Sequence, residues 1–126
     1  MRDFRKLMAW QKADELVMRI YEITAAFPVE ERFGITSQVR RAAVSVPANI
    51  AEGCGRETVV DFRHFLHQAR GSLYEVEYYI HLSSRLGYTP PAEQAALSAQ
   101  CSEVARVLQG LINSLDRQIK QGRKRN

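Results

Sequence analysis

Long apolar runs are missing from this 126-residue sequence, and no stretch approaches the roughly 20 residues that a helix needs to cross a bilayer. The first ten residues, MRDFRKLMAW, carry charge but no apolar segment of the signal-peptide type, so we expect neither a signal peptide nor a membrane partner. Only two cysteines are present, Cys54 and Cys101, and they lack the spacing of metal ligands. We therefore expect a reduced, cytoplasmic protein without a metal or other cofactor.

Acidic residues are missing from the last ten positions. Residues 117–126 contain five basic side chains and carry +5, whereas the other 116 residues hold 13 basic and 14 acidic side chains and carry −1. The high pI therefore belongs to the C-terminal end, which either attracts nucleic acid or is simply a solvated end. Chain length and a 45% hydrophobic content predict one globular domain over residues 1–116, followed by a basic tail over residues 117–126.

Strand patterns are also missing, and apolar residues recur at helical spacing in four segments. The first predicted helix runs from about Met8 to Phe27 and the second from about Thr36 to Glu52. Thr58, with Asp61 three residues later, predicts the start of a third helix that ends near Leu86. Thr89 and Pro90 predict the N-cap and first turn of the fourth.

The fourth predicted helix carries apolar residues spaced mostly four and three apart, which is typical of a bundle seam. They are Leu97, Cys101, Val104, Leu108, Leu111, Leu115 and Ile119. Because the linkers are short, neighbouring helices should run antiparallel. The predicted fold is an all-α, antiparallel, up-down-up-down four-helix bundle.

Pro47 lies near the middle of the second predicted helix. An interior proline costs about 3 kcal/mol or more, because it removes a hydrogen-bond donor and its ring clashes with the preceding turn. Small residues surround it in the run AAVSVPANIA and would let another backbone come close. We expect a helix that is kinked at Pro47 and held in that shape by packing.

The second and third predicted helices each have an apolar or aromatic surface on the side away from the core. Such patches usually mark an interface, so we expect these surfaces to meet other subunits in a homo-oligomer. The candidate interface residues are Val44, Pro47, Ala48, Ala51, His67, Gly71, Tyr74, Tyr78, His81 and Arg85. A polar strip separates the two apolar sides of the second helix, and its side chains are expected to bond to one another. The strip consists of Gln38, Arg41, Ser45, Asn49 and Glu52.

Catalytic patterns are weak. His64 and His67 lie three apart on a helix but point outward, so they are polar edges rather than an inward metal pair of the di-iron type. Cys101 is expected to be buried, and Cys54 to be more exposed but without a nearby histidine to activate it. The run Gly53-Cys54-Gly55 fits a phosphate cradle or, more simply, a helix stop followed by a helix start. We expect no catalytic residues, and hence a protein that is not an enzyme.

Three runs carry a family resemblance: WQKADELV from Trp10 to Val17, RRAAVSVPANIAEGCGR from Arg40 to Arg56, and FLHQARGSLYEVE from Phe65 to Glu77. Together they make the chain resemble the 23S ribosomal RNA intervening-sequence proteins over nearly its whole length. The resemblance implies a cytoplasmic bacterial four-helix bundle that assembles into a homopentamer. This family is also similar to the accessory variability determinant of diversity-generating retroelements, a basic ring that binds nucleic acid and a reverse transcriptase. No catalytic residues are established for it.

Two functions stay open. In the first, the protein is a nucleic-acid-associated accessory protein, with RNA or DNA as its partner. The candidate phosphate contacts are Arg5, Lys6, Arg40, Arg41, Arg56, Arg117, Lys120, Arg123, Lys124 and Arg125. In the second, it is a structural ring that holds a protein partner, with no nucleic-acid role. A basic patch confined to one face would favour the first.

Overall fold

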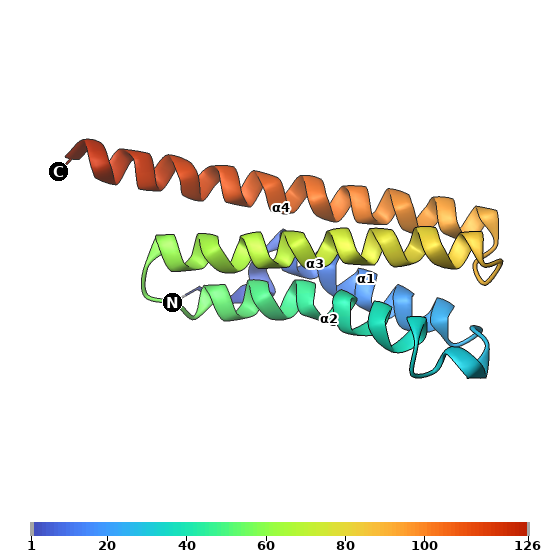
Figure 1. Cartoon of the computed structure of the whole chain (residues 1–126). Coiled ribbons are helices and arrows are strands. Elements are labelled where there is room, and N and C mark those ends of the chain that lie inside the picture. The colour runs from blue at the N-terminus through green and yellow to red at the C-terminus, as the bar shows by residue number, and fades with distance from the viewer. Residues whose placement is uncertain (1, 126) are drawn as a thin grey trace.

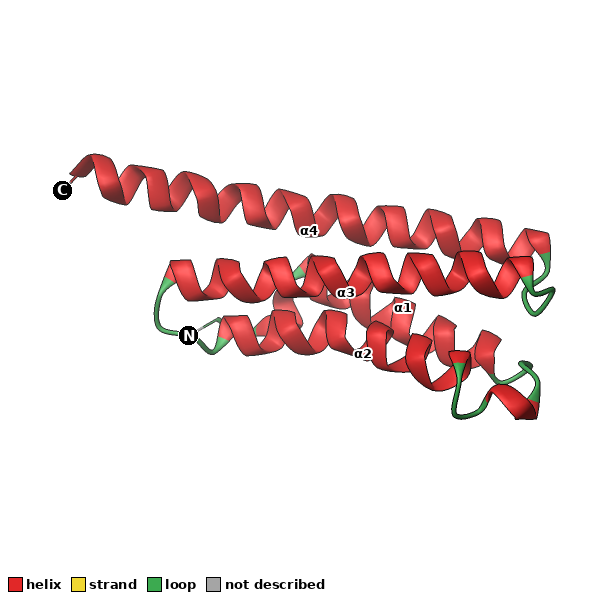
Figure 2. Ribbon diagram, in the orientation of Figure 1, coloured by secondary structure: helices red, strands yellow, loops and turns green. Residues whose placement is uncertain are grey.

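The computed structural model describes residues 2–125, and every regular element in that range is a helix (Figure 2). The four long helices are α1 (Met8–Thr24), α2 (Ile35–Cys54), α3 (Val59–Arg85) and α4 (Pro91–Arg125). Two short 3-10 helices, η1 (Phe4–Lys6) and η2 (Val29–Glu31), precede α1 and α2. The prediction of an all-α protein with four helices is confirmed.

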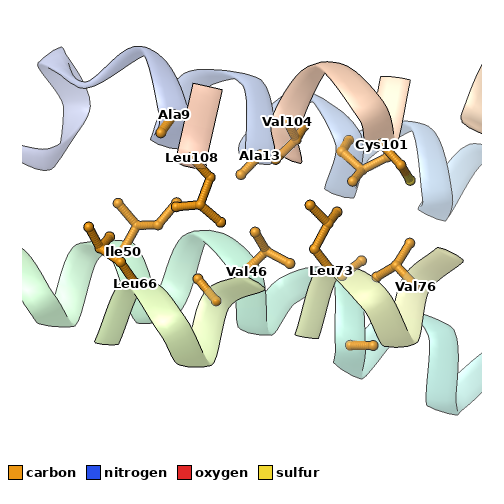
Figure 3. Close-up of a cluster of buried hydrophobic side chains, with 14 of the residues drawn as sticks. Ala9, Ala13, Val46, Ile50, Leu66, Leu73, Val76, Cys101, Val104 and Leu108 are labelled. Atoms are coloured by element: carbon orange, nitrogen blue, oxygen red, sulfur yellow. The ribbon is translucent and has the colours of Figure 1, made fainter. Parts of the chain in front are cut away.

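The four helices lie side by side, with their short connections at alternate ends (Figure 1). α2 and α3 form the most extensive pair; α4 packs against α3, and α1 contacts both α2 and α4. All four helices contribute to one core, in which side chains such as Ala13, Ile50, Leu73 and Val104 point toward one another (Figure 3). No helix among the described residues is apolar over a length sufficient to span a bilayer.

Both ends of α3 follow the predicted signals. The Thr58 hydroxyl oxygen accepts a hydrogen bond from the Asp61 backbone N–H at 3.1 Å, which is the expected N-cap. At the other end Gly87 has φ +78°, a left-handed conformation that favours glycine. The next N–H, of Tyr88, donates to the Ser83 carbonyl at 2.8 Å and closes the helix.

The start of α4 differs from the prediction. The helix begins at Pro91, and the Thr89 hydroxyl lies 2.9 Å from the Ser83 hydroxyl, where both residues are buried. Thr89 thus ties the α3–α4 loop to the end of α3. A hydroxyl that has a buried partner available satisfies its hydrogen bond there, and sequence spacing does not show that partner.

The seam of α4 also differs by one residue. Ile112 is buried and Leu111 only half-buried, so the buried series runs Leu108, Ile112, Leu115. Ile119, also expected in the seam, is half-buried. A step of four rather than three after Leu108 keeps the stripe facing the other helices, because an α-helix turns once in 3.6 residues.

Two residues near the C-terminal half of α2 are more buried than predicted. Pro47 is buried inside the single chain, whereas the sequence pattern placed it on the outer surface. Cys54 was expected to be exposed, and this was wrong: α2 continues through Cys54, whose side chain is 1% exposed in the core. Both lie in the part of α2 that packs against α3.

That packing is close. The Ser45 and Ser72 hydroxyls are 2.9 Å apart across the two helices. Near the end of α2, a Cβ built on Gly53 would lie 2.8 Å from Cδ1 of Phe62 and 3.0 Å from Cβ of Phe65. Only glycine fits there without a shift of α3.

Candidate nucleic-acid interface

Basic residues gather around the first two turns of α3. The Arg2 guanidinium carbon lies 4.6 Å from the centre of the Phe62 ring, and that of Arg56 lies 4.6 Å from the Phe65 ring. The Arg2 backbone N–H donates to the Cys54 carbonyl at 3.3 Å, which ties the N-terminal segment to the end of α2. Two segments distant in sequence thereby place guanidinium groups on neighbouring rings of one helix.

A hollow of about 400 Å³ extends this surface toward the N-terminal segment. Arg2, Phe4 and Arg5 line one side, and Ala51 and Gly55 of the α2 end line the other. Arg5 is exposed and lies 3.5 Å from an Asp3 carboxylate oxygen. Such an exposed ion pair contributes little to stability, so Arg5 can exchange this partner for a phosphate at small cost.

The other side of the same α3 turns faces α4 across a hollow of about 450 Å³. Arg63 forms an ion pair with Asp116 there, and Lys120 and Arg123 line the same hollow. Together these contacts define the basic end, at the N-terminal turns of α3: Arg2, Arg5, Arg56, Arg63, Lys120 and Arg123.

Residues 117–125 continue α4 rather than forming a separate irregular tail. With 35 residues against 27 in α3, α4 is about 12 Å longer at 1.5 Å per residue. Figure 1 shows its C-terminal end extending past the other helices. Arg117, Lys120 and Lys124 are exposed and share one face at spacings of three and four, with Arg123 beside them. The side chain of Arg125 lies outside the described residues.

Lys6 and Arg56 are the remaining candidate phosphate contacts near the basic end. Lys6 is exposed in η1. Arg56 donates to the Glu52 carboxylate at 2.8 Å, as an ion pair between residues four apart. Part of the positive charge here is therefore balanced by local carboxylates, among them Asp3, Glu52 and Asp116.

Arg40 and Arg41 lie on the N-terminal half of α2 and do not join the basic end. Arg40 donates to the Thr24 hydroxyl at 2.8 Å and stacks 4.5 Å from the Tyr21 ring centre, so it fastens α2 to α1. Arg41 is exposed and makes no hydrogen bond or ion pair with other described residues. Within the polar strip, Asn49 donates to the Ser45 carbonyl at 2.8 Å and to its hydroxyl at 2.9 Å, as expected, but Arg41 does not participate.

The predicted interface residues are mostly exposed in the single chain. Val44, Tyr74 and Tyr78 are 42%, 60% and 57% exposed. Ala48, Gly71, His81 and Arg85 are also exposed, Ala51 and His67 are half-buried, and Pro47 is buried. Nothing lies within 4 Å of a Cβ built on Gly71.

Two of the three histidines on α3, His64 and His67, have a local partner, although His67 Nε2 is buried without one among the described residues. His64 Nε2 lies 3.0 Å from the Gln68 amide, and His67 Nδ1 lies 3.0 Å from the Arg70 guanidinium. Burial lowers the pKa of His67, and the charges of Arg70 and Arg63 lower it further. Over residues 2–125, no three His, Cys, Asp or Glu side chains gather closely enough to hold a metal ion.

The sequence did not single out Arg2, Arg63 or Arg32. Arg2 precedes the first helix, and Arg63 finds Asp116 across 53 positions of sequence. Only the aromatic pair Phe62 and Phe65 was a usable signal, because the faces of aromatic rings attract guanidinium groups.

The two thiols are both free and buried. Burial raises the pKa of the Cys54 thiol, although the nearby Arg2 charge opposes this, and burial raises the pKa of Cys101 to about 12. Gly53 faces Phe62, so the glycine before Cys54 is explained by helix packing rather than by a phosphate cradle.

At about pH 8 we expect neither thiol of the native protein to react quickly with an aromatic disulfide reagent, because the attacking species is the thiolate. After unfolding in denaturant, both should react, since their pKa values fall back toward the usual range. Rapid labelling of Cys54 in the native state would contradict its burial.

Comparisons with known proteins concern the family and the fold. A structural comparison matched a crystal structure from Bacteroides thetaiotaomicron, described as a protein of unknown function from the S23 ribosomal protein family, with a TM-score of 0.77 and 24% identity. The match covers 83% of this chain and 95% of the other, and at this identity it concerns the fold. No curated protein matched. The family model described as "23S rRNA-intervening sequence protein" matches residues 5–110, and the chain therefore belongs to that family.

Proposed function

We propose that this protein is a non-enzymatic, cytoplasmic accessory protein that assembles into a homo-oligomer and binds nucleic acid through phosphates at the basic end. One observation carries this: segments separated in sequence place six basic side chains around the first turns of α3. The family description names 23S rRNA, which favours RNA over DNA. The two free cysteines fit a reducing compartment.

The α4 extension supports phosphate binding. A projecting helix with Arg117, Lys120 and Lys124 on one face presents several positive charges along a line, as a phosphate backbone requires. Cations in the last turns of a helix are also favoured by its dipole, which helps this segment to stay helical despite its like charges. The family match stops at residue 110, so this segment is a feature of this chain beyond the matched region.

Assembly is the second part of the proposal. We propose an antiparallel up-down-up-down bundle with α2 kinked at Pro47, in which the outer faces of α2 and α3 meet neighbouring subunits of a pentamer. The exposed Val44, Tyr74 and Tyr78 support this, because large apolar and aromatic groups in one patch usually mark an interface. Gly71 supports it too: a glycine inside a helix costs about 1 kcal/mol relative to alanine. Close approach of another chain would explain why it is there.

The exposed tyrosines also favour an alternative, in which the ring holds a protein partner and has no nucleic-acid role. Tyrosine is enriched at protein interfaces because it buries a large ring at little entropic cost. The two functions differ in their salt dependence.

Replacing Gly71 with leucine tests assembly. Because nothing within the chain meets a Cβ at Gly71, Gly71→Leu should leave helicity and folding intact but weaken the oligomer. Gly110→Leu is the matched control, since Gly110 is also inside a helix with nothing within 4 Å. Multi-angle light scattering at micromolar concentration should show smaller species for Gly71→Leu alone. A wild-type monomer of 14.4 kDa would contradict the assembly.

Removing charge from the basic end tests nucleic-acid binding. The double variant Lys120→Gln, Arg123→Gln should bind an RNA duplex more weakly. The slope of the logarithm of its binding constant against the logarithm of salt concentration should become less steep by about 0.9 for each phosphate that is no longer neutralised. The pair Arg19→Gln and Arg106→Gln removes the same charge elsewhere and should have a much smaller effect. Fluorescence anisotropy titrations from about 50 mM salt upward measure both.

Equal effects of the two pairs would move the binding site away from the basic end. Deletion of residues 117–126 should weaken binding still further while leaving the oligomer intact, because the last fully buried residue of α4 is Leu115. Absence of any binding by the full-length chain at about 50 mM salt would leave the protein-holding ring as the better hypothesis.

A further inference from the structure

A second basic site lies away from the basic end, in a hollow of about 590 Å³ on the N-terminal half of α2. We call it the α2 groove. Arg32, Arg40 and Arg41 line it together with the rings of Tyr21 and Phe33 and the side chain of Thr36. Val44 lies at its edge, so the groove adjoins the surface proposed for assembly. No acidic residue is among its lining residues. Next to the groove, one carboxylate oxygen of Glu31 accepts a hydrogen bond from the Tyr88 hydroxyl at 3.1 Å, and the other lies 2.7 Å from a Cβ built on Gly34, at the start of α2.

The three guanidinium groups are placed differently. Arg40 is held in position by its hydrogen bond to Thr24 and its stacking on Tyr21. Arg32 stacks on Phe33, with its guanidinium carbon 4.8 Å from the ring centre. Arg41 is exposed and has no partner among the described residues. The held guanidinium of Arg40 and the two more accessible ones of Arg32 and Arg41 line the same groove. Together they are suited to bind a doubly charged oxyanion.

The first turn of α2 adds backbone donors. The helix begins at Ile35 after Gly34, which has no side chain to cap it. The first N–H groups of a helix have no partner within the helix, and the helix dipole makes this end attractive to anions. The Glu31 carboxylate, beside Gly34, already supplies negative charge at this end, so the arginines are the main source of charge for a ligand. Thr36 and Ser37, both in this turn, line the groove.

Thr36 has an unpaired hydroxyl beside the groove. Its side chain is 8% exposed, and its hydroxyl oxygen is buried without a hydrogen-bond partner among the described residues. Buried hydroxyls almost always have a partner, because leaving one unpaired is costly. Threonine in a helix has two accessible χ1 rotamers, so a rotation can turn this hydroxyl into the groove to meet an acceptor there.

The ring of Phe33 indicates what else the ligand carries. Phe33 is 84% exposed, although it is among the most apolar side chains in the chain. Arg32 covers one face of this ring, which leaves its remaining surface for a planar apolar group. An inorganic anion alone would leave Phe33 uncovered.

We propose that the α2 groove binds a small molecule in which a phosphate monoester is attached to a planar ring, as in a nucleoside monophosphate. The phosphate meets Arg41, Arg32 and the Thr36 hydroxyl, and the ring stacks beside Phe33. This goes beyond nucleic-acid binding at the basic end and does not depend on it.

Isothermal titration with adenosine 5′-monophosphate, inorganic phosphate and adenosine tests this site in the full-length protein. We expect the monophosphate to bind, phosphate to bind more weakly, and adenosine to bind least, because the charge contacts dominate. Adenosine binding as tightly as the monophosphate would overturn the assignment of a phosphate site. Deleting residues 117–126 should not change the result, which separates this site from the basic end.

Two substitutions and a matched control locate the site. Arg41→Gln and Thr36→Val should each lower affinity for the monophosphate about tenfold or more, because each removes a hydrogen bond to a charged group. Arg106→Gln removes the same charge from an exposed position of α4 outside both basic sites and should leave affinity unchanged. Thr36→Val should also raise the melting temperature of the unliganded protein, because it removes an unpaired buried hydroxyl. A cooperative melt at that higher temperature shows that the variant is folded.

Equal affinity of Arg41→Gln and Arg106→Gln would place binding outside the α2 groove. Absence of binding at millimolar monophosphate would also overturn the inference. If Phe33→Asp then dissociated the oligomer, the groove would be covered by a second copy of the chain instead.

Discussion

The close approach of α2 to α3 is the contact on which the rest of the structure depends. At Gly53 the two helices come so near that a single added carbon would meet the ring of Phe62. Further along, the Ser45 and Ser72 hydroxyls bond directly between the helices. This packing fixes where Phe62 and Phe65 lie, and their rings in turn hold Arg2 and Arg56 in place. The basic end is thus built on the α2–α3 contact rather than on charged residues alone.

The same contact leaves the outer sides of both helices for other molecules. With their inner sides buried against each other, α2 and α3 present Val44, Tyr74 and Tyr78 outward. The arginines are divided as well: one group surrounds the first turns of α3, and another lines the α2 groove at the opposite end of α2. A near-neutral body with localised charge is consistent with discrete anion sites, whereas an evenly basic surface would attract polyanions everywhere.

Much of the fold could be predicted because helical periodicity and capping signals are local. Thr58 and Gly87 bound α3 as their chemistry predicts. The predictions failed where a residue's environment depends on how the chain packs rather than on sequence spacing. Thr89 bonds to Ser83 instead of capping α4, Cys54 is buried under neighbouring helices, and Ile112 replaces Leu111 in the seam. The candidate sites were harder still, because Arg63 and Asp116, or Arg2 and Phe62, meet only after the helices pack.

The effect of Gly53→Ala on stability tests the α2–α3 contact most directly, with Gly110→Ala as the control. Alanine normally stabilises a helix by about 1 kcal/mol relative to glycine, and Gly110→Ala should show this gain, since nothing lies within 4 Å. Gly53→Ala should instead lose about 1–3 kcal/mol, because its Cβ overpacks against Phe62 and Phe65. Urea unfolding measures both changes. A Gly53→Ala variant as stable as Gly110→Ala would contradict the close approach of the two helices.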